Sequence, residues 1–238
     1  MSQAPSRHGW LPGTYLSRLA PGLRDELLSL GGQRVVRANE LLTRQGERET
    51  GVFLLRSATS GGAVCAKVTR LVRNGSEALL GVRVAGDVIG EGAALREDRT
   101  RSATVTACAD LLVQVVERRQ FLAYLHRNPE AWQALCALIS DRLDWANRRR
   151  ADFGSYDVKV RLVRVLLDLA QSHGVPGPLG MDLGVDVSQE ELGRLIGARP
   201  DAVGAALKAL KANGLVTSRY RGVRIRDLDA LRRVADGD

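Results

Sequence analysis

The apolar residues of this chain change their spacing at residue 128, and this change limits the folds that the chain can adopt. Over residues 34–117 they occur in short, β-branched runs such as RVVRA, GVFLLRSA and LLVQVVE. Glycine-rich or charged turns lie between these runs. Many short strands at this spacing predict an antiparallel sandwich or roll. From Asn128 onward the apolar residues recur at the spacing of helices. We therefore expect an α+β protein.

Composition excludes several classes of protein. No run approaches the roughly 18–20 apolar residues of a membrane span, and the first residues lack a charged-then-apolar export signal. Cys65, Cys108 and Cys136 form no CxxC or Cys/His spacing, which argues against a disulfide framework, a zinc finger or a cluster-binding motif. We expect a cytoplasmic protein with no metal and no membrane partner.

A long helix is predicted to start at Asn128, the N-cap, with Pro129 in its first position, and to break at residues 153–156. It carries two apolar stripes. The first contains Ala131, Leu135, Leu138 and Trp145, and the second contains Trp132, Cys136, Ile139, Leu143 and Ala146. One stripe is enough to dock a helix on its own domain, so the second favours pairing with its copy in a homodimer. The alternative is a helix that is fully buried within one subunit.

A helix-turn-helix is predicted between Ser188 and residue 212. Ser188 and Glu191 have the spacing of a capping box, Gly197 makes a turn, and Pro200 opens a second helix. Two short strands follow, with Tyr220, Arg221 and Gly222 at their tip, which indicates a basic wing.

The basic residues of this segment favour DNA as its partner. The net charge of +8 indicates an anionic partner only weakly, but four arginines lie between residues 219 and 226 with no acidic residue among them. Lys208 and Lys211 lie on the second helix and could contact phosphates. We interpret the segment as a winged helix that places its second helix in a major groove. The alternatives are a generic αα-hairpin or a winged helix that contacts only protein.

A second candidate site lies in GDVIGEGAALREDRTRSATV, where Arg101 and Ser102 follow Gly90 and Glu91 after ten residues. An arginine and backbone N–H groups can hold a phosphate, and a carboxylate can accept a hydrogen bond from a ribose hydroxyl. The alternative is a surface salt bridge between Glu91 and Arg101. The residues alone leave both interpretations open.

The order of these motifs resembles the cyclic AMP receptor protein (Crp/Fnr) family of bacterial transcription regulators. The resemblance begins near Leu16 and includes QGE at 45–47, GDVIGE, RSATV, the long helix, DVKVR and the winged helix. It implies an N-terminal antiparallel β-roll of the cyclic-nucleotide-binding jelly-roll type over residues 1–127, a dimerisation helix over 128–153, and a C-terminal winged helix-turn-helix over 154–238.

The resemblance also implies roles for individual residues. Glu91 would meet the ribose 2′-hydroxyl of cyclic AMP or cyclic GMP, Arg101 and Ser102 would meet the cyclic phosphate, and Gly90 would let the backbone approach. The residues implied to approach the pocket from the long helix are Arg142, Ala146 and Asn147. The residues expected at the DNA are Ser188, Gln189, Arg199, Pro200, Asp201, Lys208, Arg219 and Arg221.

The sequence departs from the family pattern both near the nucleotide and in the second helix of the winged helix. Ala146 stands where cyclic-AMP-responsive members have a hydroxyl residue, and losing that hydrogen bond is worth about 1 kcal/mol. The second helix has Pro200, Asp201 and Ala205 where the family commonly has an Arg–Glu pair and a further Arg, which predicts a different operator. Arg199 replaces the usual Ser cap, at a cost of about 1 kcal/mol.

The sequence thus predicts a homodimeric transcription regulator whose affinity for a palindromic operator is controlled by a cyclic nucleotide, with RNA polymerase as a further partner. The alternative is a ligand-independent or redox-responsive regulator with a vestigial pocket, for which Cys65 or Cys108 could act as a switch. No Ser/His/acid or metal-ligand constellation is present in the sequence, so we do not expect an enzyme.

Overall fold

The computed structural model describes residues 10–57, 64–96, 100–219 and 222–237. The N-terminal roll consists of two antiparallel sheets with the strand orders β1-β8-β3-β6 and β2-β7-β4-β5. Their strands are β1 (Gly32–Val36), β2 (Leu41–Thr43), β3 (Val52–Ser57), β4 (Cys65–Leu71), β5 (Glu77–Val84), β6 (Val88–Ile89), β7 (Thr104–Ala107) and β8 (Leu111–Val116). The predicted antiparallel roll is confirmed.

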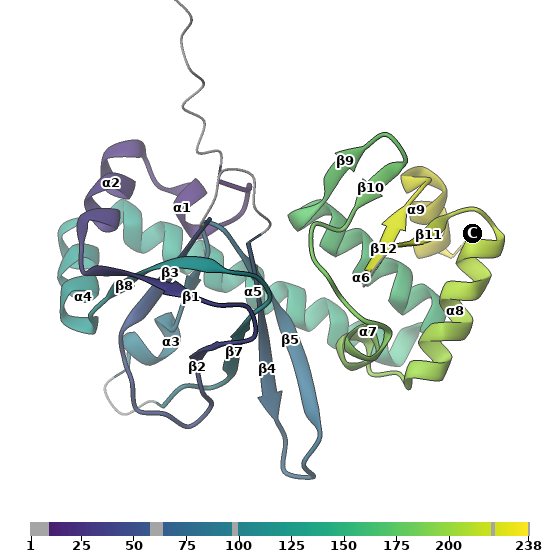
Figure 1. Ribbon diagram of the computed structural model, residues 1–238, viewed down its shortest axis with the longest axis horizontal. Helices are drawn as coiled ribbons and strands as arrows, with labels where there is room; N and C mark the ends of the chain where they lie inside the picture. The colour runs from purple at the N-terminus through teal and green to yellow at the C-terminus, as the bar shows by residue number, and fades with distance from the viewer. Residues whose placement is uncertain (1–9, 58–63, 97–99, 220–221, 238) are drawn as a thin grey trace, which may run out of the picture.

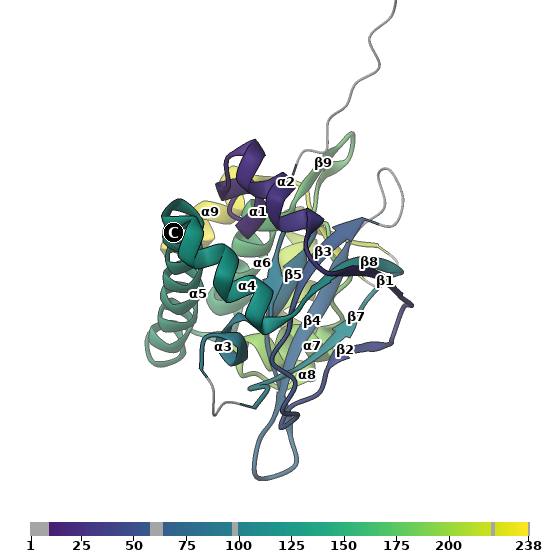
Figure 2. The same ribbon diagram turned by 90° about the vertical axis from the view of Figure 1, so that its left-hand side faces the viewer.

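Apolar side chains from both sheets fill the inside of the roll. Phe53 and Leu55 alternate with Leu54 along β3, so that they point into the roll while Leu54 packs toward the helices. Period-two alternation places successive side chains on opposite faces of a strand. The helices that cover this outer face are α1 (Tyr15–Arg18), α2 (Pro21–Ser29), α4 (Arg118–Arg127) and the start of α5, and Figure 2 shows α4 and α5 side by side.

The helix α5 (Pro129–Ser155) connects the roll to the C-terminal unit. Its 27 residues span about 40 Å at 1.5 Å per residue, and Figure 1 shows it running from under the roll toward the right-hand part of the molecule. The first predicted stripe is buried at Ala131, Leu135 and Leu138. The second stripe lies exposed: Trp132, Cys136, Ile139, Leu143 and Ala146.

The helix continues through residues 153–155, where the sequence predicted a break. A glycine inside a helix costs only about 1 kcal/mol, and tertiary contacts hold this last turn. Asp152 forms an ion pair with Arg164 at 3.1 Å, and the guanidinium carbon of Arg161 lies 5.1 Å from the centroid of the Phe153 ring. These partners belong to the next helix, so Gly154 remains helical although it has no side chain to pack.

The C-terminal unit contains the predicted helix-turn-helix and wing. Its elements are α6 (Val158–His173), β9 (Val175–Gly177), β10 (Gly180–Asp182), α7 (Gln189–Ile196), α8 (Pro200–Ala212), β11 (Val216–Arg219), β12 (Gly222–Ile225) and α9 (Leu228–Asp236). The small sheet has the order β11-β12-β10-β9. The strands β11 and β12 form the wing, whose tip residues Tyr220 and Arg221 lie outside the described residues.

The roll and the C-terminal unit contact each other through β4, β5 and α7. Lys67 Nζ on β4 lies 2.6 Å from a carboxylate oxygen of Glu191 on α7. A second ion pair joins Arg194 on α7 to Glu77 on β5 at 2.5 Å. One apolar cluster runs across this boundary, with members from β4, β5, α6 and α7. No helix in the described part of the chain is long and apolar enough to cross a membrane.

The turn of the helix-turn-helix depends on a close approach between Gly197 and the end of α5. Gly197 has a φ of +59°, and a Cβ at this position would lie 1.9 Å from Cε1 of Phe153. Any other residue at position 197 would therefore have to hold its backbone in the left-handed region, and its side chain would displace the Phe153 ring.

We predict that Gly197→Ala lowers the free energy of unfolding by at least about 1 kcal/mol more than Gly214→Ala, because overpacking adds to the left-handed backbone cost. Gly214 is the matched control, since its φ is +71° and a Cβ there would meet nothing within 4 Å. Urea unfolding of both variants measures the difference. Equal losses in the two variants would show that the Phe153 contact contributes nothing.

Candidate functional site

Gly90 joins β6 to the short helix α3 (Glu91–Ala94) at the candidate ligand site. Its φ is +88°, and a Cβ at this position would lie 1.9 Å from Nη1 of Arg101 and 2.9 Å from the carbonyl oxygen of Gly51. Only glycine leaves room for the guanidinium here. In this structure the side chain of Arg101 fills the space beside Gly90.

Arg101 is a buried cation, with only 3% of its surface exposed. Its guanidinium donates to the carbonyl oxygens of Gly90 at 3.2 Å and Gly51 at 2.6 Å. The nearest carboxylate, that of the half-exposed Glu49, lies 3.4 Å away. Burial lowers the pKa of Arg101, and the charge of Glu49 acts in the opposite direction. Among the described residues, Nε has no hydrogen-bond partner.

The QGE motif holds Arg101 in position. The backbone N–H of Gly46 donates to the carbonyl oxygen of Arg101 at 2.9 Å, and the N–H of Arg101 donates to the carbonyl of Glu47 at 2.8 Å. Ser102, the next residue, is exposed beside Arg101. The loop of residues 45–47 therefore fixes the backbone from which both predicted phosphate ligands project.

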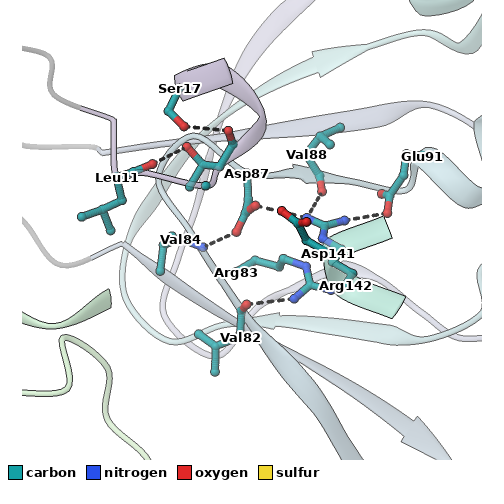
Figure 3. Close-up of polar contacts among 12 residues, drawn as sticks. Leu11, Ser17, Val82, Arg83, Val84, Asp87, Val88, Glu91, Asp141 and Arg142 are labelled. Atoms are coloured by element: carbon teal, nitrogen blue, oxygen red, sulfur yellow. Dashed lines mark hydrogen bonds and ion pairs between the residues drawn. The ribbon is translucent and has the colours of Figure 1, made fainter. Parts of the chain in front are cut away.

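Arg142 reaches from α5 to Glu91 at the candidate site. It donates to Glu91 Oε1 at 2.6 Å through Nη1, and to Asp87 Oδ1 at 3.1 Å and the carbonyl of Val88 at 3.0 Å through Nη2 (Figure 3). Asp87 also accepts a bond from the N–H of Val84 at 3.0 Å. Glu91 thus forms its ion pair with Arg142, and among the described residues the ion pair of Arg101 is with Glu49 instead.

A second arginine lies beside this network. Arg83 points toward Arg142 and donates to the carbonyl of Val82 at 2.9 Å (Figure 3). Burial lowers the pKa of Arg83 to about 10, and the neighbouring charge of Arg142 acts in the same direction. The carboxylates of Asp87 and Glu91 balance these two cations. Breaking any one pair in this group changes the electrostatic environment of the others.

Ala146 and Asn147 lie one turn beyond Arg142 and are exposed on α5. Ala146 belongs to the exposed stripe. A base that contacted these two residues would therefore lie against the same face of α5 that leaves Trp132, Ile139 and Leu143 uncovered, at 42%, 37% and 58% exposure.

The residues predicted to contact DNA all belong to the C-terminal unit. The capping box is confirmed, because Ser188 Oγ accepts from the N–H of Glu191 at 3.2 Å and Glu191 accepts from the N–H of Ser188 at 2.8 Å. The side chain of Arg199, the N-cap of α8, makes no capping bond. The exposed predicted residues on α7 and α8 are Gln189, Arg199, Pro200, Asp201 and Lys208. Arg219 lies at the end of β11, and Arg221 lies outside the described residues.

Sequence reasoning missed Asp87, Glu49 and Arg83. Asp87 directly precedes the VIGE segment, so its place in the motif was visible, whereas its bond to Arg142 depends on how α5 crosses the roll. Glu49 and Arg83 carry no local signal, since only the fold brings them to the site. In the described ranges, no group of three or more His, Cys, Asp or Glu side chains is placed to hold a metal ion.

Comparison with known proteins identifies both halves of the chain. A family model for the cyclic nucleotide-binding domain matches residues 33–128, and one for the Crp-like helix-turn-helix domain matches residues 160–234. The cAMP-activated global transcriptional regulator Vfr of Pseudomonas aeruginosa is 29% identical over 199 residues, which cover 81% of this chain and 88% of Vfr. The cAMP-activated regulator CRP of Escherichia coli is 28% identical over 181 residues, covering 74% and 81% of the two chains.

Solved structures agree with this assignment at the level of the fold. A CRP-family transcriptional regulator from Thermus thermophilus aligns with a TM-score of 0.69 at 24% identity, covering 86% of this chain and 97% of that chain. The c-di-GMP responsive regulator CLP from Xanthomonas campestris aligns with a TM-score of 0.70 at 24% identity, covering 87% and 100%. The motif order, the roll, the helix-turn-helix and these matches together show that the chain belongs to the Crp/Fnr family of DNA-binding transcription regulators.

Proposed function

We propose that this chain is a homodimeric regulator whose affinity for a palindromic operator is controlled by a cyclic nucleotide bound at Glu91, Arg101 and Arg142. In this proposal residues 1–127 sense the nucleotide, 128–153 dimerise and 154–238 bind DNA in the cytoplasm. The observation that carries the proposal is the buried guanidinium of Arg101, whose Nε is unpartnered within the described structure. A buried charge without a strong counter-ion is costly, and a phosphate would provide one.

The cyclic phosphate would accept hydrogen bonds from Arg101 and from Ser102. Arginine presents its donors in a planar fork that fits two phosphate oxygens. The half-exposed carboxylate of Glu49 now lies at 3.4 Å from this guanidinium, so the phosphate would displace a weak and solvent-screened partner.

The ribose would bind at Glu91 and thereby act on α5. Arg142 holds Oε1 of Glu91 at 2.6 Å, so a ribose hydroxyl that donates to this same oxygen would compete with Arg142. Arg142 projects from α5. If α5 moves when the ligand displaces Arg142, the ligand binds the two positions of α5 with different affinities. A difference of this kind is what a ligand needs in order to shift a conformational equilibrium.

A second copy of the chain would cover the exposed stripe of α5. The stripe runs along one face of a single helix, with Leu143 the most exposed of its large side chains at 58%. Contiguous apolar surface of this kind marks an interaction site. Asn147 follows Ala146, a member of this stripe, on α5. The second subunit, paired through the stripe, would therefore bring its own Asn147 toward the base.

The recognition helix α8 would enter the major groove, with Arg199 and Asp201 reading bases and Lys208 contacting a phosphate. Cyclic AMP is the first candidate effector, since Vfr and CRP are described as cAMP-activated. Ala146 lacks the hydroxyl that would select adenine, so we expect weak discrimination between cyclic AMP and cyclic GMP. RNA polymerase is the expected further partner.

We predict that the nucleotide-stripped protein binds cyclic AMP with micromolar or tighter affinity in calorimetry. Arg101→Lys keeps the charge but loses the planar fork, and the expected loss is about 10–150-fold, from roughly 1.5–3 kcal/mol for a charged hydrogen bond. Arg96→Ala, an exposed arginine in the same segment, is the control and should bind normally. Unchanged affinity in a folded Arg101→Lys variant would contradict the proposed phosphate site.

We also predict that Ala146→Ser increases the preference for cyclic AMP over cyclic GMP by about 5–10-fold. A single hydrogen bond to the adenine amino group, worth about 1 kcal/mol, accounts for this gain. Competition between the two nucleotides on one protein sample measures it. A gain that is equal for both nucleotides would place the base away from residue 146.

Leu143→Glu should produce a monomer at concentrations where the unmodified protein is a dimer, because a charge in the centre of an apolar interface must be desolvated. Analytical ultracentrifugation checks this. Gln133→Glu adds the same charge at an exposed position of α5 outside the stripe and should remain dimeric. A dimeric Leu143→Glu variant would show that the subunits pair through another surface.

A further inference from the structure

Cys65 and Cys108 face each other across two paired strands. Ala66 on β4 lies opposite Ala107 on β7, so Cys65 and Cys108 occupy the next opposite positions. The N–H of Cys108 donates to the carbonyl of Cys65 at 2.8 Å, and their sulfur atoms lie 3.0 Å apart. Opposite residues of an antiparallel pair have Cβ atoms about 4.5–5.5 Å apart, close to the 3.5–4.5 Å that a disulfide requires. The two sulfurs can therefore bond after a small movement.

The surroundings of the two thiols differ in a way that separates their reactivity. Cys108 is half-buried, whereas Cys65 is only 3% exposed. The S–H of Cys65 donates to the sulfur of Cys108, which lowers the pKa of Cys108, and the charge of Lys67 acts in the same direction. The same bond and burial raise the pKa of Cys65. The thiolate is the reactive form of cysteine, so Cys108 is both the more accessible and the more nucleophilic of the two.

We propose that Cys65 and Cys108 are a redox modification site that forms a reversible intramolecular disulfide in response to hydrogen peroxide. The Cys108 thiolate attacks one peroxide oxygen, the O–O bond breaks, and the released hydroxide takes a proton to give water. Cys65 then attacks the sulfenic acid at Cys108, its thiol proton leaves with the hydroxyl group as a second water, and the S–S bond forms. A dithiol reductant returns two electrons and two protons.

The site lies beneath the contact between the roll and the helix-turn-helix. Cys65 belongs to the same apolar cluster as Leu192 and Leu195 of α7. Lys67, two residues along β4, holds Glu191 of α7 at 2.6 Å, and the charge of Glu191 acts on Cys108. Oxidation therefore changes the strands against which α7 packs. We expect slower amide hydrogen exchange in β4, β7 and α7 and a higher Tm after oxidation, both reversed by dithiothreitol.

The test uses the full-length protein without nucleotide or DNA, so its outcome is independent of the proposed effector. After peroxide treatment and alkylation, free thiols should fall from three to one, with Cys136 still free. Digestion without reduction should yield the Cys65 peptide joined to the Cys108 peptide. Cys136→Ser is the matched control and should form the same cross-link.

Two variants distinguish the steps. Cys65→Ser should leave a sulfenic acid on Cys108 that dimedone traps, and Cys108→Ser should abolish both the cross-link and the trapping. The proposal is overturned if the unmodified protein keeps both thiols reduced while Cys136 reacts, or if Cys108 is oxidised further with no bond to Cys65. The measurement on the unmodified protein stands even if a variant does not fold.

Discussion

The burial of the Arg101 guanidinium is the feature on which the proposed nucleotide site depends. The guanidinium occupies the space that a side chain at residue 90 would need, and it is fixed by the carbonyl oxygens of Gly90 and Gly51. These contacts place a positive charge inside the roll, and its nearest carboxylate is that of the half-exposed Glu49, at 3.4 Å. In the proposed function an anion at this site would add a counter-ion to a guanidinium that backbone carbonyls and the half-exposed Glu49 now compensate.

Arg142 connects this site to the rest of the molecule. It is the residue of α5 that contacts Glu91, Asp87 and the backbone of Val88, and α5 in turn ends under the helix-turn-helix, where Phe153 packs against Gly197. The candidate site, the exposed stripe and the turn before α8 thus all lie on or contact one helix, α5. A ligand that competes for Glu91 acts on that element directly, which is why the proposed control of DNA affinity needs no longer chain of contacts.

Local patterns predicted the parts of the fold that local interactions determine. The capping box at Ser188 agrees with the structure because such a cap involves neighbouring residues. The start of α5 at Pro129 also agrees, although the predicted N-cap Asn128 makes no side-chain capping bond. The continuation of α5 through Gly154 was missed, since partners on α6 hold its last turn. The ion pair of Glu91 with Arg142 and the pairing of Cys65 with Cys108 could not be read from spacing either, because the crossing of α5 and the register of β4 with β7 bring these residues together.

In the proposed function, the nucleotide changes DNA affinity through Arg142. Fluorescence anisotropy measures this coupling, using a duplex selected by this protein from a random pool, titrated with and without saturating cyclic AMP. We predict a change of about 5–150-fold in Kd for DNA, an equal change in the affinity for cyclic AMP when DNA is bound, and a smaller change in Arg142→Gln. The same Kd for DNA with and without bound cyclic AMP would contradict it.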